Sequence, residues 1–209
     1  MSRICKPYAA IRTFLLLLCG WVPLLTALGA AGQTRIYDIR YGNNAIGTLE
    51  TKQETTGSTR RITLKSRVQM KLLSRMEVDI FAEYRHNVLH AAKATRLQGK
   101  SSADSKETST EKSANGYTVI RKGERSILHH ARITYCVSDL YFTEPREIRQ
   151  VYSETLGVLL PLKLAADKRY ELTMPDGKRS YYRYEKGKLK EVEISHALGK
   201  AFFTAREGA

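Results

Sequence analysis

The carboxylates around Pro145 are the residues best suited to acid and base chemistry. Glu144 and Glu147 lie three residues apart, and Asp139 precedes them in the stretch SDLYFTEPRE. Two acids in one cleft can act as general acid and general base, as they do in glycoside hydrolysis. Their spacing does not show that the fold brings them together, so a hydrolase that uses carboxylates near Glu144 is an alternative hypothesis.

Other chemical motifs point away from catalysis. The chain has no Gly-x-Ser-x-Gly elbow and no glycine-rich phosphate loop. His86 and His90 fall where we predict a strand interrupted at Asn87, and the adjacent His129 and His130 would point to opposite faces of a strand. Neither pair has the helical geometry of a strong metal motif. The sequence therefore predicts no catalytic residue, no metal and no cofactor.

Aromatic and basic side chains alternate near the C-terminus. Tyr182 and Tyr184 flank Arg183 in the stretch RSYYRYEKGK. Such a surface could stack on sugars or bases and hold phosphates. The period of two also predicts that the tyrosines pack inward while the basic side chains face solvent, and we favour this interpretation. The candidate ligand-binding residues of the whole chain are Tyr141, Phe142, Glu144, Tyr152, Tyr182 and Tyr184.

The elements that must position these residues are strands, because the hydrophobic period is two over most of the chain. Apolar residues alternate with basic or polar ones from Ile62 to Leu72, and with mainly acidic ones from Met76 to Tyr84. Leu73 and Ser74 separate the two runs, which predicts a hairpin whose outward basic row faces outward acids. The stretch from Glu107 to Ser113 is polar on both faces, so it is either a solvated edge strand or mobile.

The fold class predicted for the chain is all-β and mainly antiparallel, with a single strongly curved sheet or half-barrel meander. Only Ser126 to Phe142 could hold a helix, so we expect at most one or two short helices after the signal peptide described below. The polar stretch from Lys100 to Lys106 is predicted to be a loop. The remaining predicted strands are Arg35–Tyr41, Ala45–Glu54, Val88–Gln98, Tyr117–Lys122, Ile148–Thr155, Val158–Leu164, Arg169–Met174, Lys178–Glu185, Leu189–His196 and Lys200–Ala205.

The aromatic stretch before Pro145 is predicted mainly to pack a corner of the sheet. Two sets of residues alternate in this segment, Ile148, Gln150, Tyr152 and Glu154 with Arg149, Val151 and Ser153, and we interpret it as a strand that enters the sheet after this corner. Leu140, Tyr141 and Phe142 would then form a plug at the corner, from one helical turn that begins at Ser138. Glu144 is expected to anchor the turn through hydrogen bonds.

The first part of the chain is typical of a secretory signal peptide. Arg3, Lys6 and Arg12 precede an almost wholly apolar run from Phe14 to Leu28, and small residues follow it. Cleavage after Ala31 best satisfies the small-x-small requirement.

Residues 1–31 are therefore predicted to be a signal peptide, and residues 32–209 a single β domain exported to the periplasm or the outside of a bacterial cell. The chain has no Asn-x-Ser/Thr sequon, which fits a bacterial envelope protein. An uncleaved membrane anchor formed by residues 13–31 is the alternative, because its length is close to the roughly 20 residues that span a bilayer.

Charge and cysteine content limit the expected partners and the source of stability. The formal net charge is +14, which favours anionic neighbours such as lipid or envelope polymer. Nucleic acid is not expected, because a secreted protein seldom meets it. Cleavage would leave Cys136 as the one cysteine, so no internal disulfide is predicted and stability must come from burial. Cys136 itself is expected to be a small buried hydrophobe.

Several motifs resemble a family of uncharacterised secreted bacterial β-rich proteins, a domain of unknown function. They are the strand and turn from Tyr37 to Gly47, the LYFTEP and VYSETLG segments, and YELTMPDGKRSYYRYEKGKLKEVEI from Tyr170. The chain is also similar, at the level of fold, to periplasmic half-barrel proteins of the lipoprotein-carrier type. That similarity implies an acyl chain held in the concave face of the sheet.

The leading functional hypothesis is a non-enzymatic cell-envelope protein that binds a lipid or other hydrophobic ligand in the concave face of its sheet. The alternative is a structural or interaction module that docks on another envelope protein through an exposed strand edge or the basic face. The sequence does not predict an oligomeric state.

Overall fold

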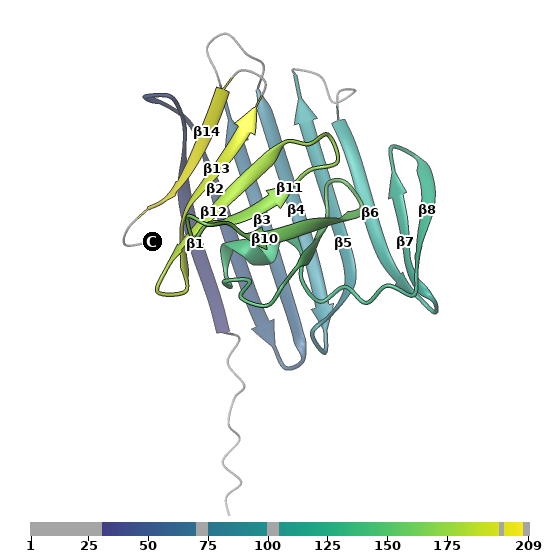
Figure 1. The fold of residues 1–209 in the computed structure, drawn as a ribbon. Coiled ribbons are helices and arrows are strands. Elements are labelled where there is room, and N and C mark those ends of the chain that lie inside the picture. Colours follow the sequence, from purple (N-terminus) through teal and green to yellow (C-terminus); the bar gives the residue numbers. More distant parts are fainter. Residues whose placement is uncertain (1–30, 70–74, 100–104, 197–198, 207–209) are drawn as a thin grey trace, which may run out of the picture.

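Among the described residues, fourteen antiparallel strands form one sheet that is not closed, which confirms the predicted all-β fold class (Figure 1). The computed structural model describes residues 31–69, 75–99, 105–196 and 199–206. The predicted signal peptide therefore lies outside the described residues, except for Ala31 at the start of β1. The strands are β1 (Ala31–Tyr41), β2 (Asn44–Thr56), β3 (Thr59–Val68), β4 (Met76–Arg85), β5 (Val88–Gln98), β6 (Ser105–Ser113), β7 (Gly116–Arg121), β8 (Glu124–His129), β9 (Gln150–Ser153), β10 (Val158–Leu164), β11 (Tyr170–Thr173), β12 (Arg179–Glu185), β13 (Lys188–His196) and β14 (Gly199–Ala205).

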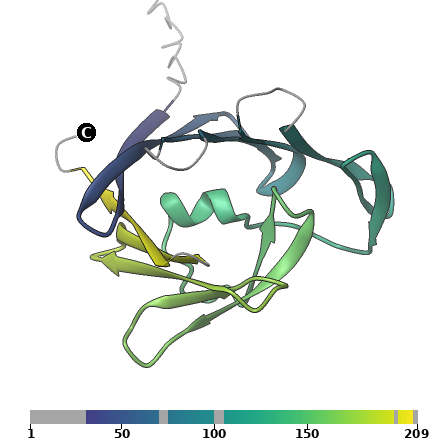
Figure 2. The ribbon, with the colours of Figure 1, turned by 90° about the horizontal axis from the view of Figure 1, so that it is seen from above.

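The sheet has two arms that meet where β1 pairs with β14. The first arm runs from β1 to β8, and the second arm runs from β14 back to β9, so β8 and β9 are the two ends of the sheet. Figure 2 shows the second arm, in green and yellow, curled across the inner face of the first, in purple and teal. A 3-10 helix, η2 (Val137–Tyr141), lies between the arms. The predicted curved meander is thus rolled around one short helix.

Burial follows the period of two that the sequence shows. Ile62 and Leu64 of β3 are buried on the inner face, whereas Arg61 points outward and pairs with Glu83 of β4 at 2.8 Å. Arg67 of β3 likewise contacts outward acids of β4. The predicted hairpin with a basic row facing an acidic row is therefore confirmed. Its predicted turn, together with the end of the first strand, lies outside the described residues.

The prediction for Glu107 to Ser113 was wrong, because this stretch is neither an edge nor mobile but forms most of β6 between β5 and β7. Its inner face is polar, yet it is buried by contacts with the second arm. The Thr108 hydroxyl donates to the carbonyl of Thr155 at 3.0 Å, and the Thr110 and Tyr152 hydroxyls share a hydrogen bond of 2.6 Å. Short hydroxyl side chains can therefore fill an inner face when the facing element supplies partners.

The stretch from Ser126 to Phe142 contains the short helix η2, but it begins within strand β8. A two-residue turn of Lys122 and Gly123 reverses the chain before β8. Both residues have positive φ angles, 53° and 84°, as the tightest hairpin turns require. No helix among the described residues has the length and apolar character needed to cross a membrane.

Candidate functional site

Four of the six predicted ligand-binding residues belong to or contact the plug, a name we give to η2 together with Phe142. Tyr141 and Phe142 belong to the plug and are buried. The ring of Tyr182 on β12 meets that of Tyr141 edge to face, with 6.4 Å between centroids. The hydroxyl of Tyr184, also on β12, donates to the carbonyl of Leu140. These residues therefore converge, but they converge on the protein's own chain.

The sheet satisfies the carbonyl groups at the end of η2. Helix ends leave carbonyls without partners inside the helix. The carbonyl of Tyr141 accepts hydrogen bonds from the Arg35 guanidinium at 2.7 Å and from the Tyr37 hydroxyl at 3.3 Å, both on β1. The carbonyl of Thr143, just beyond the plug, accepts a hydrogen bond from the hydroxyl of Tyr135. The inward tyrosines thus hold the plug through their hydroxyl groups.

Asp139 anchors the plug to the first arm. Its carboxylate forms an ion pair with Arg60 of β3 and accepts a hydrogen bond from the hydroxyl of Tyr84 on β4. It also accepts a hydrogen bond of 2.7 Å from the backbone N–H of Cys136, while the Arg60 guanidinium lies 4.0 Å over the Tyr84 ring. A buried carboxylate is tolerated when it is paired and fully hydrogen-bonded, as this one is. Asp139 therefore has a structural role that accounts for its burial.

Glu154, at the end of β9, is a second buried acid beside the plug. One carboxylate oxygen accepts a hydrogen bond of 3.1 Å from the backbone N–H of Ser138, and the other has no partner among the described residues. Burial raises the pKa of Glu154 to about 7. The side chain is 1% exposed, so solvent and substrate do not reach it. It links the end of β9 to η2.

The remaining predicted residues, Glu144 and Tyr152, have separate surroundings. Glu144 accepts a hydrogen bond of 3.2 Å from Tyr170 and pairs with Arg146 at 3.1 Å, as expected for a residue that anchors the turn. Tyr152 lies on β9 and contacts Thr110 of the first arm, and an isolated bridge joins it to Cys136 just before η2. Glu144 and Asp139 are thus held by different partners.

The inner face of the rolled sheet is filled by the plug and by apolar and tyrosine side chains of both arms. Cys136 is completely buried in this core, as predicted. Among the described side chains of His, Cys, Asp and Glu, no three could together hold a metal ion.

A second site lies at the end of the first arm where β5, β6 and β7 reach the same rim. Arg96 continues the inward phase of Ala94 on β5, and Arg121 continues that of Val119 on β7. Lys106 of β6 lies directly opposite Arg96. The next inward residue of β6, Thr108, lies opposite Arg121. Three cations on neighbouring strands therefore share the inward face at one rim.

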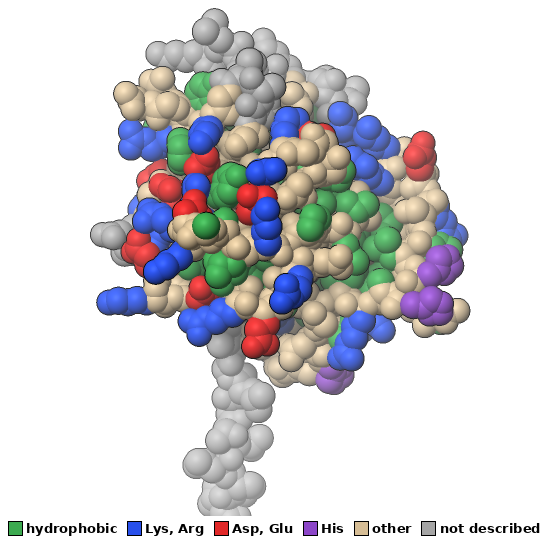
Figure 3. Space-filling view, in the orientation of Figure 1, with side chains coloured by type: hydrophobic (Ala, Val, Ile, Leu, Met, Phe, Trp, Pro, Cys, Tyr) green, Lys and Arg blue, Asp and Glu red, His purple; other side chains and the backbone are tan. Residues whose placement is uncertain are grey.

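These side chains line a cleft of about 140 Å³, which we call the rim cleft. Lys122 of the β7–β8 turn adds a fourth cation, and Thr155 and Leu156 close the cleft from the second arm. One acid, Glu107, also lines it, and this residue pairs with Lys93 at 3.1 Å. In Figure 3, Lys and Arg side chains gather at the upper right of the molecule, at this end of the first arm.

The cations of the rim cleft differ from those of the second arm in their partners. Within the described residues, Arg96, Lys106, Arg121 and Lys122 form no ion pair with a carboxylate.

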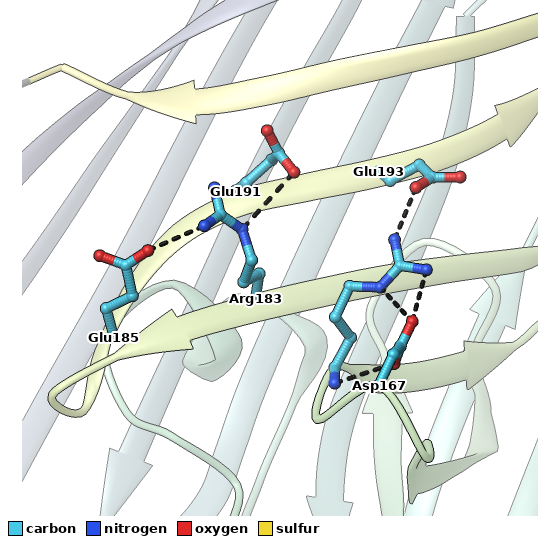
Figure 4. A network of polar contacts seen from close by, with 6 residues as sticks. Asp167, Arg183, Glu185, Glu191 and Glu193 are labelled. Carbon is cyan, nitrogen blue, oxygen red and sulfur yellow. Dashed lines mark hydrogen bonds and ion pairs between the residues drawn. The ribbon is translucent and has the colours of Figure 1, made fainter.

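On the second arm, by contrast, Arg183 contacts Glu185 at 2.8 Å and Glu191 at 3.7 Å (Figure 4). Arg169 is also paired with two acids, Asp167 at 2.7 Å and Glu193 at 2.6 Å. These two arginines of the second arm are thus paired with acids, whereas the four cations of the rim cleft are not paired with a described carboxylate.

The sequence patterns do not predict the rim cleft, although they contain one signal for it. Arg96 is in phase with Ala92 and Ala94, so a cation falls on the core-facing side of a predicted strand. The convergence of three such cations depends on the pairing of β5, β6 and β7. That pairing could not be predicted, because the sequence does not decide whether residues Glu107 to Ser113 form an edge strand or a mobile segment.

Comparison with known proteins identifies a family. The family model described as Domain of unknown function (DUF6134) matches residues 37–206, which include both the plug and the rim cleft. This match confirms the resemblance to a domain of unknown function. One similar solved structure is the crystal structure of a beta-barrel-like protein of domain of unknown function DUF1849 from Brucella abortus. It is 10% identical, with a TM-score of 0.40, over 86% of this chain and 98% of that chain. The search of the curated proteins returned no match.

Proposed function

The chain belongs to the DUF6134 family, a domain of unknown function, and we propose that it is a non-enzymatic binding module whose rim cleft recognises an anionic group of a partner. The observation that carries this proposal is the inward placement of Arg96, Lys106 and Arg121 at one rim without a described carboxylate partner. Like charges directly opposite one another on neighbouring strands destabilise a sheet. A bound anion would remove that repulsion.

The chemistry of the cleft favours phosphate or carboxylate as the bound group. Guanidinium groups match the two oxygens of either anion, and lysine adds a mobile point charge. The hydroxyl of Thr108 and the backbone around Thr155 add polar groups, although these two already bond to one another. The cleft volume of about 140 Å³ is below the roughly 300 Å³ at which small-molecule pockets begin. The cleft therefore suits the anionic group of a larger partner.

The lining of the cleft supports binding rather than catalysis. Among the lining residues, Glu107 is the one acid that could act as a general base, and its carboxylate is paired with Lys93. No histidine, cysteine or serine lines the cleft. General acid–base catalysis requires a titratable group within hydrogen-bond reach of the reacting atoms. The hydrolase hypothesis based on Glu144 gains no support from this geometry, since Glu144 is paired with Arg146 elsewhere.

The hypothesis of a hydrophobic ligand in the concave face would require the plug to leave. Asp139, Arg35, Tyr37 and Tyr184 all hold the plug in place, so its departure would break several buried polar contacts at once. The rim cleft needs no such change. If the chain is exported as predicted, the anionic groups near it are those of lipid headgroups, envelope polymers and other envelope proteins.

Calorimetric titration with inorganic pyrophosphate at constant ionic strength tests the proposal. We expect saturable binding that Arg121→Gln weakens about tenfold, because one charged hydrogen-bond donor is worth ~1.5–3 kcal/mol. The matched control is Lys112→Gln, which removes one charge at the far end of β6, about 20 Å from Lys106 at the strand rise of ~3.3 Å per residue. Absence of binding, or an equal loss in the control, would overturn the proposal.

A further inference from the structure

We propose that the partner is an acidic polypeptide segment that adds to the sheet as a strand along the free edge of β8, beside the rim cleft. This inference rests on the proposed function of binding an anionic partner, and Arg125 on the outer face of β8 adds a preference for acidic groups of its own. The edge of a sheet presents unpaired N–H and C=O groups, and an extended peptide can pair with them. The backbone would then supply affinity, and the side chains of β8 would select the sequence.

β8 is an open end of the sheet. It is the last strand of the first arm, and it pairs with β7 over six residues without a register shift. Every residue of β8 is exposed except Leu128, which is half-buried. Figures 1 and 2 both show β8 as the outermost strand, with the β7–β8 hairpin projecting beyond the second arm.

The other end of the sheet is covered. The N–H of Tyr152 on β9 donates to the carbonyl of Tyr135 at 3.0 Å, and an isolated bridge joins Tyr152 to Cys136. All residues of β9 except Gln150 are buried. Natural proteins also protect edges with proline, lysine, or a bulge. The sequence of β8, ERSILH, carries two charged residues, Glu124 and Arg125, but it has no proline or lysine, and its regular register has no bulge.

The turn before β8 determines which backbone groups are available. Arg121 and Glu124 flank the two-residue turn, so they form the hydrogen-bonded pair that closes the hairpin. Backbone groups alternate along an antiparallel strand. The N–H and C=O groups of Arg125, Ile127 and His129 therefore point away from β7 and toward an added strand.

The side chains of β8 define the chemistry of the partner. Arg125, Ile127 and His129 alternate onto the outer face, where Ile127 is 47% exposed and Ile120 of β7 is 44% exposed. Arg125 forms no ion pair with a described carboxylate, and neither does Lys122 in the turn. Opposite charges and apolar residues pair favourably across strands. An added strand should therefore place an apolar residue opposite Ile127 and acids two positions away on either side.

Fluorescence anisotropy with two labelled peptides of equal composition tests this pattern. In Thr-Glu-Thr-Val-Thr-Glu-Thr the acids and the valine share one face of a strand, whereas in Glu-Thr-Thr-Val-Thr-Thr-Glu they lie on opposite faces. We expect the first peptide to bind at least tenfold more tightly than the second. N-methylation of alternate backbone nitrogens in the first peptide should abolish binding, because the strand could no longer pair on the methylated edge.

Two substitutions at Ile127 separate the contribution of the backbone to peptide binding from that of the side chain. Ile127→Pro removes the central outward N–H, and we expect it to lower the affinity for the first peptide more than tenfold. Ile127→Thr keeps the N–H and should lower the affinity about threefold. Both variants should bind pyrophosphate as the unmodified protein does, which shows that the fold and the rim cleft are intact.

The outcomes distinguish this inference from the proposed function. If pyrophosphate binds at the rim but the two peptides bind alike, strand addition is wrong and the anion-binding function stands. Unchanged peptide binding in Ile127→Pro would exclude β8 as the docking edge. If pyrophosphate and both peptides fail to bind, the proposed function and the inference built on it both fail.

Discussion

Arg96 and Lys106 lie directly opposite one another on β5 and β6, and both belong to the inward phase of their strands. Like charges in this relationship oppose folding, and Arg121 on the next strand adds to the repulsion. A cluster of like charges lowers the stability of the folded protein, but it favours the binding of an anion. Substitutions in it should therefore change the two properties in opposite directions.

Lys106→Gln should stabilise the protein and weaken anion binding. Removal of one charge relieves the repulsion with Arg96, and we expect the free energy of unfolding to rise by about 0.5 kcal/mol. Urea denaturation at low ionic strength measures the first effect and pyrophosphate titration the second. Lys112→Gln should change neither property appreciably. A loss of stability in Lys106→Gln would show that the lysine has a structural partner and would contradict this account.

Gly157→Ala should destabilise the contact between the two arms. Gly157 has a positive φ of 71°, and an added Cβ would lie 2.6 Å from Cγ1 of Val119 on the first arm. The backbone strain at positive φ and the steric clash with Val119 should together lower the free energy of unfolding by about 2 kcal/mol.

Val119→Ala removes Cγ1, the atom that the added Cβ of Gly157→Ala would contact, and so it provides the control for this clash. Thermal or urea denaturation of the double variant should show less destabilisation than the sum of the two single variants, because neighbouring sites are not additive. Strict additivity would mean that the arms do not meet at these two residues.

Asp139→Asn should loosen the plug. The substitution leaves the half-buried Arg60 without its carboxylate and weakens the hydrogen bonds to Tyr84 and the Cys136 N–H. Loss of one partner of a buried ion pair costs ~3 kcal/mol or more, although Arg60 retains some contact with solvent. Urea denaturation measures the loss. Asp176→Asn breaks an exposed pair with Lys178 and should have little effect, so similar losses in both variants would argue against an anchoring role.

Glu154→Gln should remove a pH dependence of stability. The pKa of Glu154 is raised from 4.5 to about 7 by burial, so the folded state binds its proton more tightly than the unfolded state does. Its contribution is therefore fully present below pH 4.5 and is lost as the pH rises toward 7. The loss is about 3 kcal/mol by linkage. The variant should thus be more stable than the unmodified protein at pH 8.

Unfolding curves of both proteins between pH 4 and pH 8 isolate this effect, because all other titrating groups are shared. We expect the difference in free energy of unfolding between them to grow with pH over this interval. The glutamine can still accept the hydrogen bond from the Ser138 N–H, so the comparison concerns the proton alone. A constant difference across the range would mean that Glu154 keeps an ordinary pKa in the folded protein.

The strands could be predicted from the sequence because burial on one face leaves a period of two in residues such as Ile62 and Leu64. The short helix at Ser138 and the inward packing of Tyr182 were also predicted, and both are confirmed. The role of β6 could not be predicted, because Thr108 and Thr110 are polar and are expected to face solvent. In the structure they are buried, since the second arm provides their hydrogen-bond partners. Polar burial of this kind depends on contacts between residues more than forty positions apart.

The aromatic residues near Pro145 are correctly predicted to pack a corner, but Tyr37 and Tyr84, which help to hold the plug, are not singled out by the sequence. The rim cleft could not be found in the same way. Its cations lie on three strands, and the sequence does not give their register. A cation in phase with buried residues, such as Arg121 after Tyr117 and Val119, is the local signal that was available.

Mapping of amide chemical shifts by NMR during a pyrophosphate titration tests the central claim most directly. We predict saturable shifts at Arg96, Lys106 and Arg121, with little change at Lys112 or at the basic residues of the second arm such as Arg183. Shifts that spread over all basic residues without saturation, or that are largest on the second arm, would contradict an anion-binding site at the rim of β5, β6 and β7.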